Sequence, residues 1–249
     1  MKRSQALVVH CEAPGFTEAT SGHVPGSPLS VPLVWFSPLD ALRDRLDRYI
    51  TLLDMEERAR ADRFRFERDR ERYILGHGLL REVLGWHLAQ PAAQLVMPRE
   101  EFGKPFLEGH PVHFNLSDTK DAVLVALHRL PIGADVETLN RRTDHEEVAG
   151  HYFTPREVAS IAKASDGKRR FLELWTRKEA VLKACGVGLM DDLHSLEVGE
   201  RENRMTISHP EFMRLAAPEY HVQTALIGTG HLASIACEEH FDRCILQKV

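Results

Sequence analysis

The chain has 249 residues, of which 43% are hydrophobic and 28% are charged, and its formal net charge at pH 7 is -5. This length suits one large domain or two small ones, with enough residues to bury a core without disulfides. The slightly acidic balance excludes the global basic field of a nucleic-acid-binding protein, so any anionic ligand must be held by local clusters of cations.

The cysteines and the apolar runs indicate a cytoplasmic protein. The four cysteines show no CxxC spacing, which favours reduced thiols. No apolar run approaches the length of a membrane span, and the N-terminal run ALVV is too short for the core of a signal peptide. We therefore expect no membrane contact, and we expect the chain to act as a monomer.

The first half of the chain is predicted to run from strand to helices and back to strands. Residues 1–30 are expected to be a flexible N-terminal segment, because Gly, Pro, Ser and Thr are frequent from position 12 onward. A first strand follows at 31–39, and the apolar spacing is helical from 40 to 87. After Pro91 the pattern predicts strands, at 112–118, 122–128 and 132–137.

The second half is predicted to repeat this order. Thr154, Pro155 and Glu157 form the N-terminal signature of a helix, within a helical region at 145–187. A further helix is expected to begin near Lys168 and to end at Gly186 or Gly188, where glycine suits a helix C-terminus. Two more strands are predicted, at 221–228 and 230–237.

Shifting the chain by about 98 residues aligns Arg58 with Arg156 and Arg72 with Arg170. Chance can produce so weak a repeat. If it reflects a duplication, the fold is α+β, with two similar subdomains that meet near residue 130. We place them at residues 31–130 and 131–249, and the cleft between two such subdomains is a usual place for a ligand.

Two acids, Asp135 and Glu137, lie two residues apart in the predicted strand GADVE. Alternate strand residues share a face, so the two carboxylates project together. At about 5–6 Å and an effective dielectric near 20, their repulsion costs about 3 kcal/mol, so a cation is expected beside them. A solvated edge strand with two unused acids is the simpler alternative.

The stretch LWTRKEAVLKACG places Trp175, Glu179 and Lys183 on one face of a helix. Together with Asp135 and Glu137, Glu179 makes a set of three carboxylates that suits Mg²⁺, an ion that commonly bridges to substrate phosphates. Lys183 would then neutralise phosphate charge. Taken alone, Glu179 and Lys183 are equally consistent with a surface ion pair.

Other candidate anion ligands lie upstream. FGKPFL presents Lys104 in a turn, and in FNLSDT Ser117 follows a strand and offers its hydroxyl and backbone N–H. Residues 56–72 hold seven arginines and six acids, which mostly indicates a solvated, self-paired helix face. Arginines that escape such pairing would be good phosphate ligands.

In order along the chain, FGKPFL, FNLSDT, IGADVE and LWTRKEAVLKACGVGL resemble the motifs of the Sfp-type 4′-phosphopantetheinyl transferases. The likeness covers roughly residues 33–200, and the last motif is long and specific. It implies a pseudo-two-fold α+β fold with coenzyme A between the halves. It also implies Mg²⁺-dependent transfer of the 4′-phosphopantetheine arm to a serine of an apo acyl or peptidyl carrier protein, with adenosine 3′,5′-bisphosphate as the other product.

The resemblance implies roles for four residues around the metal. Asp135 and Glu179 match metal ligands, Glu137 matches the third acid, and Lys183 matches the lysine beside the pyrophosphate. The carrier serine must lose a proton, and either Glu179 or Glu137 is the candidate base. We therefore predict that Glu179, Lys183 and Glu137 are catalytic.

The resemblance also implies a binding set for the rest of coenzyme A. Arg60, Arg72 and Lys104 fall where the family places cations around the adenosine and the 3′-phosphate, and Ser117 matches a residue on the 3′-phosphate side. The family pattern N-[IVL]-S-H-[ST] has a histidine where this chain has Asp118. An aspartate repels phosphate unless it turns away or pairs with an arginine, so we expect it outside the binding set.

Two other functions remain open at this point. A non-catalytic module of the same fold would bind coenzyme A or a carrier protein without transfer, and a metal-dependent phosphohydrolase would use water as the acceptor. Carriers are usually acidic, so Arg141–Arg142 or Lys168–Arg170 could form a docking patch, although each also suits a solvated surface. Carriers of fatty-acid, polyketide, siderophore and peptide synthesis are all consistent with the sequence.

Overall fold

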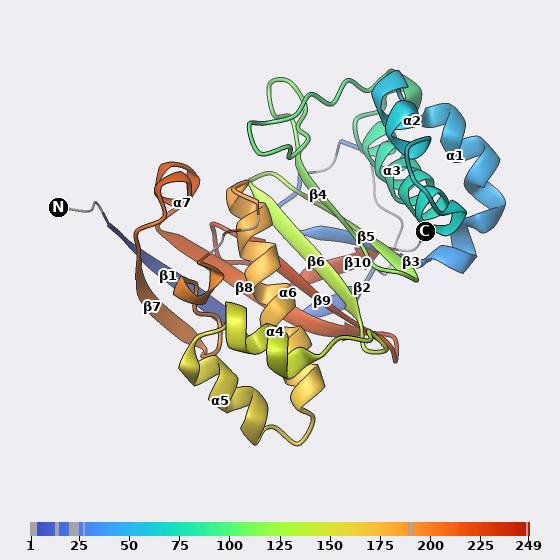
Figure 1. The fold of residues 1–249 in the computed structure, drawn as a ribbon. Coiled ribbons are helices and arrows are strands. Elements are labelled where there is room, and N and C mark those ends of the chain that lie inside the picture. Colours follow the sequence, from blue (N-terminus) through green and yellow to red (C-terminus); the bar gives the residue numbers. More distant parts are fainter. Residues whose placement is uncertain are drawn as a thin grey trace.

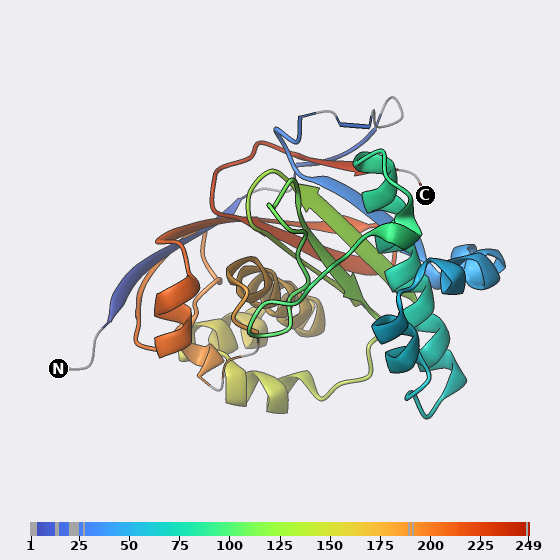
Figure 2. The same ribbon diagram turned by 90° about the horizontal axis from the view of Figure 1, so that it is seen from above.

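Two five-stranded sheets form the centre of the molecule (Figure 1). The structure is a computed structural model, and it describes residues 4–12, 15–19, 25–26, 28–188, 190, 192–247 and 249. Sheet A has the strand order β6-β9-β8-β1-β7, and sheet B has the order β2-β10-β3-β5-β4. In Figure 2, α4, α5 and α6 lie beneath sheet A, whereas α1, α2 and α3 gather beside sheet B.

The first half supplies the middle and one edge of sheet B. β3 pairs antiparallel with β5, and β5 pairs antiparallel with β4, while the long helix α3 packs on β4 and β5. The elements in chain order are β3 (Leu33–Pro38), the 3-10 helix η1 (Leu39–Arg45), α1 (Leu46–Leu52), α2 (Met55–Ala61), α3 (Glu67–His87), η2 (Ala92–Gln94), β4 (His113–Asp118) and β5 (Ala122–His128).

The second half repeats this topology in sheet A. β6 pairs antiparallel with β9, β9 pairs antiparallel with β8, and the long helix α6 packs on all three strands. Its elements are β6 (Ile132–Thr138), α4 (His145–Tyr152), α5 (Pro155–Lys163), α6 (Gly167–Cys185), η3 (Leu193–Ser195), β7 (Glu202–Ile207), α7 (Pro210–Leu215), β8 (Glu219–Ile227) and β9 (His231–Cys237). The predicted α+β fold with two similar subdomains is confirmed.

The two ends of the chain each complete the sheet of the opposite half. β1 (Gln5–Glu12) lies between β8 and β7 in sheet A, and β10 (Cys244–Gln247) lies between β2 (Phe16–Glu18) and β3 in sheet B. The expectation of a flexible segment over residues 1–30 is therefore wrong for β1 and β2. Leu7, Val9 and Cys11 alternate along β1 and are buried in the core under α6. Its partner strands are distant in sequence, so composition alone does not reveal the pairing.

Local sequence signals place the helix ends correctly. Thr154 and Glu157 form a capping box at the start of α5, with Pro155 as its first residue. α6 ends at Cys185, and Gly186 follows in the left-handed conformation at φ +83°. No prediction covers β7, α7 or β10. Within the described residues, no helix combines the length and apolar character needed to cross a membrane, and all four cysteines are free thiols.

The long helix of the first half carries a fully buried cation, Arg81. Its guanidinium binds the Glu57 carboxylate at 2.6 Å and Asp54 at 2.5 Å. It also donates to the carbonyls of Ala92 and Leu95, in the segment that follows α3. Asp54 and Glu57 are the two partners of the capping box that begins α2. One arginine thus joins the start of α2, the middle of α3 and the next connection.

The second half contains the same arrangement with a lysine. Lys178 in α6 is fully buried, and its ammonium lies 2.8 Å from Glu157, the third residue of α5 in its capping box with Thr154. It donates to the carbonyls of Leu193 and Leu196 at 3.1 and 2.5 Å, in the segment that follows α6. The correspondence supports the duplication that the weak sequence repeat suggested.

Removing the Lys178 side chain should destabilise the second half of the chain. We expect Lys178→Ala to lower the free energy of unfolding by about 3–5 kcal/mol, because it leaves the Glu157 carboxylate buried without its cation. Arg156→Ala on α5 is the control, since Arg156 and Glu200 lie 3.9 Å apart with side chains 73% and 66% exposed. It should cost less than about 0.5 kcal/mol. Urea denaturation followed by circular dichroism measures both, and similar losses in the two variants would contradict the assignment.

Candidate active site

A glycine allows α6 to lie directly on β6. A Cβ atom built on Gly133 would be 1.9 Å from the carbonyl oxygen of Ala180 and 2.3 Å from the amide nitrogen of Ala184. Any side chain at this position would therefore push the helix away from the strand. Because alternate strand residues share a face, the two acids that follow in β6 also face this helix.

Asp135 and Lys183 meet at this contact. The Lys183 ammonium lies 2.5 Å from Asp135 Oδ1 and 3.1 Å from the hydroxyl of Ser117, which itself donates to Asp135 Oδ1 at 2.9 Å. Asp135 is only 6% exposed. Its other oxygen, Oδ2, is buried and has no hydrogen-bond partner within the described residues. A buried carboxylate oxygen without a partner is a position that a cation would satisfy.

Glu137 lies beside Asp135 and is paired with Arg141. The Arg141 guanidinium also lies over the Trp175 ring, 5.5 Å from its centroid. Burial, and then the neighbouring Asp135, raise the pKa of Glu137 to about 7, although Arg141 opposes the shift. β6 is an edge strand of sheet A, yet Glu137 is only 9% exposed. The alternative of a solvated strand edge is therefore wrong, and the expected cations are Lys183 and Arg141.

Glu179 is half-buried on α6, one turn before Lys183. Burial, and then Asp135, raise its pKa above the ordinary value. In the part of the chain that the structure describes, no cation lies within ion-pair distance of Glu179, because Lys183 reaches across to Asp135 instead. The alternative of a Glu179–Lys183 surface pair is therefore wrong.

The three acids gather around Lys183 without converging on one point. Within the described residues, their carboxylate oxygens do not all lie within 4.8 Å of one another. Lys183 holds one oxygen of Asp135, and Arg141 holds Glu137. The donor set nevertheless fits Mg²⁺, since it consists of carboxylate oxygens, one of them buried without a partner.

Side chains from β4 join the first half to this site. Asn115 Oδ1 accepts a hydrogen bond from the amide of Ala134 at 2.9 Å, and Ser117 Oγ accepts one from the amide of Val136 at 3.2 Å. Two side chains of sheet B thereby bind the backbone of the edge strand of sheet A. The predicted contact of Ser117 with a 3′-phosphate stays a prediction, and in the structure its hydroxyl orients Asp135.

Arg60 and Arg72 lie in one pocket of about 280 Å³, next to the acids. Arg72 Nε is 2.8 Å from Asp118 Oδ2, so the aspartate at the position of the family histidine does pair with an arginine. Arg60 lies over the Tyr73 ring, 5.7 Å from its centroid. Burial raises the pKa of Asp118, and Arg72 opposes that shift. Arg99, which was not predicted, lines the same pocket.

Lys104 is not in this pocket. Its ammonium donates to the backbone carbonyls of Lys183 at 2.6 Å and of Ile132 at 3.2 Å, so it caps the end of α6 and ties it to the start of β6. Burial lowers its pKa. The structure thus brings Arg60 and Arg72 together and places Lys104 apart from them. A contact of Lys104 with coenzyme A stays a prediction.

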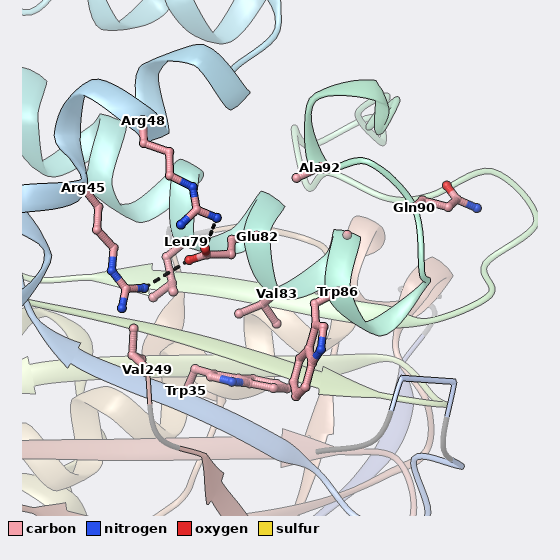
Figure 3. A pocket seen from close by; sticks show the side chains of 11 residues that line it. Trp35, Arg45, Arg48, Leu79, Glu82, Val83, Trp86, Gln90, Ala92 and Val249 are labelled. Atoms are coloured by element: carbon pink, nitrogen blue, oxygen red, sulfur yellow. Dashed lines mark hydrogen bonds and ion pairs between the residues drawn. The ribbon is translucent and has the colours of Figure 1, made fainter. Parts of the chain in front are cut away.

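A different pocket of about 460 Å³ lies between α3 and β3 (Figure 3). Figure 3 shows Arg45 and Arg48 pointing toward Glu82, and both form ion pairs with it. The Glu82 carboxylate offsets only one of the two positive charges, so these three groups keep one net positive charge. None of the predicted site residues lines it.

Comparisons of the chain with family models and with known proteins point to a single family. The model of the 4′-phosphopantetheinyl transferase superfamily matches residues 131–236, and the model of a 4′-phosphopantetheinyl transferase N-terminal region matches residues 40–129. The chain is 36% identical over 163 residues to the 4′-phosphopantetheinyl transferase HetI of Nostoc sp. (strain PCC 7120), covering 63% of this chain and 69% of that protein. This chain belongs to the 4′-phosphopantetheinyl transferase superfamily.

Two further similar proteins are also 4′-phosphopantetheinyl transferases. The psf-1 transferase of Bacillus pumilus is 32% identical over 167 residues, which is 65% of this chain and 71% of that protein. The Sfp transferase of Bacillus subtilis (strain 168) is 29% identical over 169 residues, which is 66% of this chain and 75% of that protein. The chain is therefore an enzyme of the 4′-phosphopantetheinyl transferase type, and the resemblance to the Sfp type is confirmed.

Sequence reasoning missed several residues that build this transferase site. Arg141 was considered only as a surface cation, although it follows Glu137 by four residues and pairs with it. Asn115 lies two residues before Ser117 on the same strand, so the period of two was a usable signal. Lys178 was not singled out in the sequence, because only the packed core reveals its buried partner Glu157.

The contact at Gly133 predicts a sharp sensitivity to one methyl group. Gly133→Ala should separate α6 from β6 and lower the free energy of unfolding by about 1–3 kcal/mol. Transfer activity should fall more than stability explains, because Lys183 and Glu179 move relative to Asp135. The control is Gly150→Ala in α4, where a Cβ meets nothing within 4 Å. Thermal denaturation and activity assays compare them, and full activity in Gly133→Ala would contradict the geometry.

Proposed function

We propose that this enzyme transfers the 4′-phosphopantetheine arm of coenzyme A to a serine of an apo acyl or peptidyl carrier protein and releases adenosine 3′,5′-bisphosphate. The main support is Asp135 Oδ2, a buried oxygen that has no hydrogen-bond partner among the described residues and lies on the carboxylate that pairs with Lys183. The pocket with Arg60 and Arg72 adjoins it across β4 and suits the anionic end of coenzyme A.

Mg²⁺ would be held by Asp135, Glu179 and Glu137, and it would supply positive charge to neutralise the negative charge that develops on the leaving 5′-phosphate of adenosine 3′,5′-bisphosphate. For Glu137 to join, Arg141 must release its carboxylate, and the Trp175 ring offers the guanidinium a resting place. Glu137 would therefore become a metal ligand by giving up its ion pair with Arg141, which the structure shows.

Lys183 would bind the pyrophosphate. Burial lowers its pKa, but Asp135 and then Glu179 outweigh that effect and raise it, so the ammonium stays charged. A phosphate oxygen would replace Asp135 Oδ1 as its partner, which frees that carboxylate for the metal. Lys183 and the metal ion would then place two positive charges beside one phosphate in a buried site. Such positioning and charge stabilisation lower the barrier of phosphoryl transfer.

Glu179 is the base we favour for the carrier serine. Its pKa is raised, and within the described residues no side-chain cation pairs with it, so one carboxylate oxygen could bind Mg²⁺ while the other accepts the proton. Glu137 also has a raised pKa, near 7, but Arg141 holds it. The proton would pass from the serine hydroxyl to Glu179 as the hydroxyl oxygen attacks the phosphorus that carries the pantetheine arm. The bond from that phosphorus to the bridging pyrophosphate oxygen would break, and adenosine 3′,5′-bisphosphate would leave with that oxygen.

The 3′-phosphate of coenzyme A would be bound by Arg60 and Arg72, with Ser117 and Lys104 as further candidates. Among the basic residues considered for carrier docking, Arg141 and Arg170 are engaged by Glu137 and Glu173. We therefore propose that the exposed Arg142, rather than Arg141, contributes to the docking of the carrier. We also place the boundary between the two subdomains between residues 130 and 131. We further propose that the enzyme is a monomer in the cytoplasm.

Loss of one metal ligand should abolish the reaction. Asp135→Ala or Glu179→Ala should leave less than about a tenth of the activity, a barrier increase above about 1.4 kcal/mol. The assay incubates the full chain with coenzyme A, Mg²⁺ and an apo carrier, and intact-mass spectrometry counts carriers with one added arm. Glu108→Ala, at an exposed acid, is the control and should keep full activity.

The same assay separates the alternatives. A binding module would retain coenzyme A without modifying the carrier, and a phosphohydrolase would release product without any carrier present. Removing divalent cations with EDTA should stop transfer, and Mg²⁺ should restore it. Activity that survives EDTA, or that survives both alanine substitutions, would reject the metal assignment.

The Asp118–Arg72 pair predicts weak selection for the 3′-phosphate. An aspartate in the pocket neutralises part of the charge of Arg72, so coenzyme A and dephospho-coenzyme A should be used with kcat/KM values within about tenfold of each other. Asp118→His removes one of the two carboxylates paired with Arg72, leaving Asp69 at 3.2 Å, and should increase the preference for coenzyme A. Steady-state kinetics with both substrates measures this, and a strong preference that Asp118→His leaves unchanged would refute it.

A further inference from the structure

A second cluster of ligating side chains lies on sheet A. β1 carries His10 and Glu12 with one residue between them, and β8 carries Glu219 and His221 with one residue between them. The strands are parallel neighbours, and His10 lies directly beside His221 in their register. Because alternate residues share a face, all four side chains project from the same side of the sheet.

This face is opposite to the candidate active site. Val9 and Cys11 on β1, and Tyr220 on β8, pack into the core that α6 covers. His10 and His221 alternate with these residues, so they point away from α6. The cluster is therefore separate from the acids of β6, which face that helix.

Three donor atoms in this cluster converge. Glu219 Oε1 lies 2.7 Å from His10 Nε2 and 3.5 Å from His221 Nε2, and the three atoms all lie within 4.8 Å of one another. The two imidazole rings are stacked, with centroids 4.8 Å apart. Donor atoms around a tetrahedral Zn²⁺ lie about 3.3 Å apart, so small side-chain rotations would place all three on one ion.

The remaining nitrogen of His221 is held by a carboxylate. His221 Nδ1 lies 3.0 Å from Glu12 Oε1, which also lies 2.9 Å from His240 Nδ1 in the turn after β9. A carboxylate that accepts the Nδ1 proton leaves Nε2 deprotonated and aimed at the other two donors. Metal-bound histidines in proteins usually have this carboxylate behind them, because it fixes the ring and strengthens the ligand.

We propose that His10, His221 and Glu219 bind a divalent transition-metal ion, Zn²⁺ in the first place, with Glu12 orienting His221. Two imidazole nitrogens and one carboxylate suit Zn²⁺ better than Mg²⁺, which prefers oxygen ligands. Glu12 and Glu219 together supply two negative charges to balance the ion. Glu202, the neighbour of His10 on β7, is already paired with Arg204 and is outside the set.

The ion would fasten the N-terminal strand to the second half of the chain. Its ligands come from β1 and β8, which lie side by side in sheet A but at opposite ends of the sequence (Figure 1). Metal that binds only the folded protein stabilises it by mass action. The expected effect is therefore on stability, and it does not depend on the proposed transfer reaction.

The test uses the full chain without a histidine tag, stripped of metal with EDTA. Calorimetric titration with ZnCl₂ should show one tight site, and free Zn²⁺ at about 100 times its Kd should raise Tm by roughly 5–10 °C. Binding of Co²⁺ should give the visible absorption of a low-symmetry site with nitrogen ligands. His221→Ala should weaken Zn²⁺ binding at least about tenfold.

Further variants keep the result interpretable if His221→Ala does not fold. Glu219→Gln changes a side chain that is 48% exposed, so it should preserve the sheet while weakening binding by a similar factor. His151→Ala, at an exposed histidine of α4, is the matched control and should bind Zn²⁺ normally. Glu179→Gln tests whether the ion sits in the active site, and it should leave the titration unchanged.

The outcomes are distinct. Loss of binding in His221→Ala and Glu219→Gln, with retention in His151→Ala and Glu179→Gln, supports the site. No measurable binding to the stripped protein overturns it and leaves hydrogen-bonded histidines. Binding that disappears only in Glu179→Gln also overturns it, because the ion then occupies the acids of β6.

Discussion

The close contact between α6 and β6 over Gly133 governs the position of every residue in the candidate active site. Asp135 and Glu137 on the strand meet Glu179 and Lys183 on the helix only because no side chain separates the two elements at this point. Lys104 then fixes the end of the helix to the start of the strand, through the carbonyls of Lys183 and Ile132. The same contact therefore sets both the distance and the axial register of helix and strand, and the catalytic geometry follows from packing.

The buried cations support this contact from the other side of the helix. Lys178 points into the core and ties α6 to α5 and to the next connection, whereas the adjacent Glu179 points to the site. Consecutive residues on a helix diverge by about 100°, so one short motif serves stability and chemistry on different faces. Arg81 does the same structural work in α3, where the corresponding surface lines the arginine pocket instead. One arrangement thus supports both the half that carries the three acids and the half that lines the arginine pocket.

Sequence periodicity was sufficient for the parts of the fold whose signals are local. The capping box at Thr154, the glycine that ends α6 and the alternating strands β4, β5 and β6 follow from nearest-neighbour chemistry. β1 and β10 were not predicted, because their partner strands are remote in the sequence and a short strand has no local signature of its own. In the site, the acids and Lys183 were accessible through their spacing. The partners of Lys104 and Arg141 were not, since a flexible cation can reach several acceptors and only the packed structure selects one.

The crossing of the chain ends between the two sheets has a consequence for biosynthesis. Of the strands that the structure describes, β1 is synthesised first, but its neighbours β7 and β8 are made much later, and β10, which joins β2 and β3 in sheet B, is made last. The nascent chain therefore carries an unpaired hydrophobic strand through most of translation, with its edges open to other chains. Sheet A has all of its strands once β9 has been made, whereas sheet B must wait for β10. The first half therefore completes its sheet only after the second half has been synthesised.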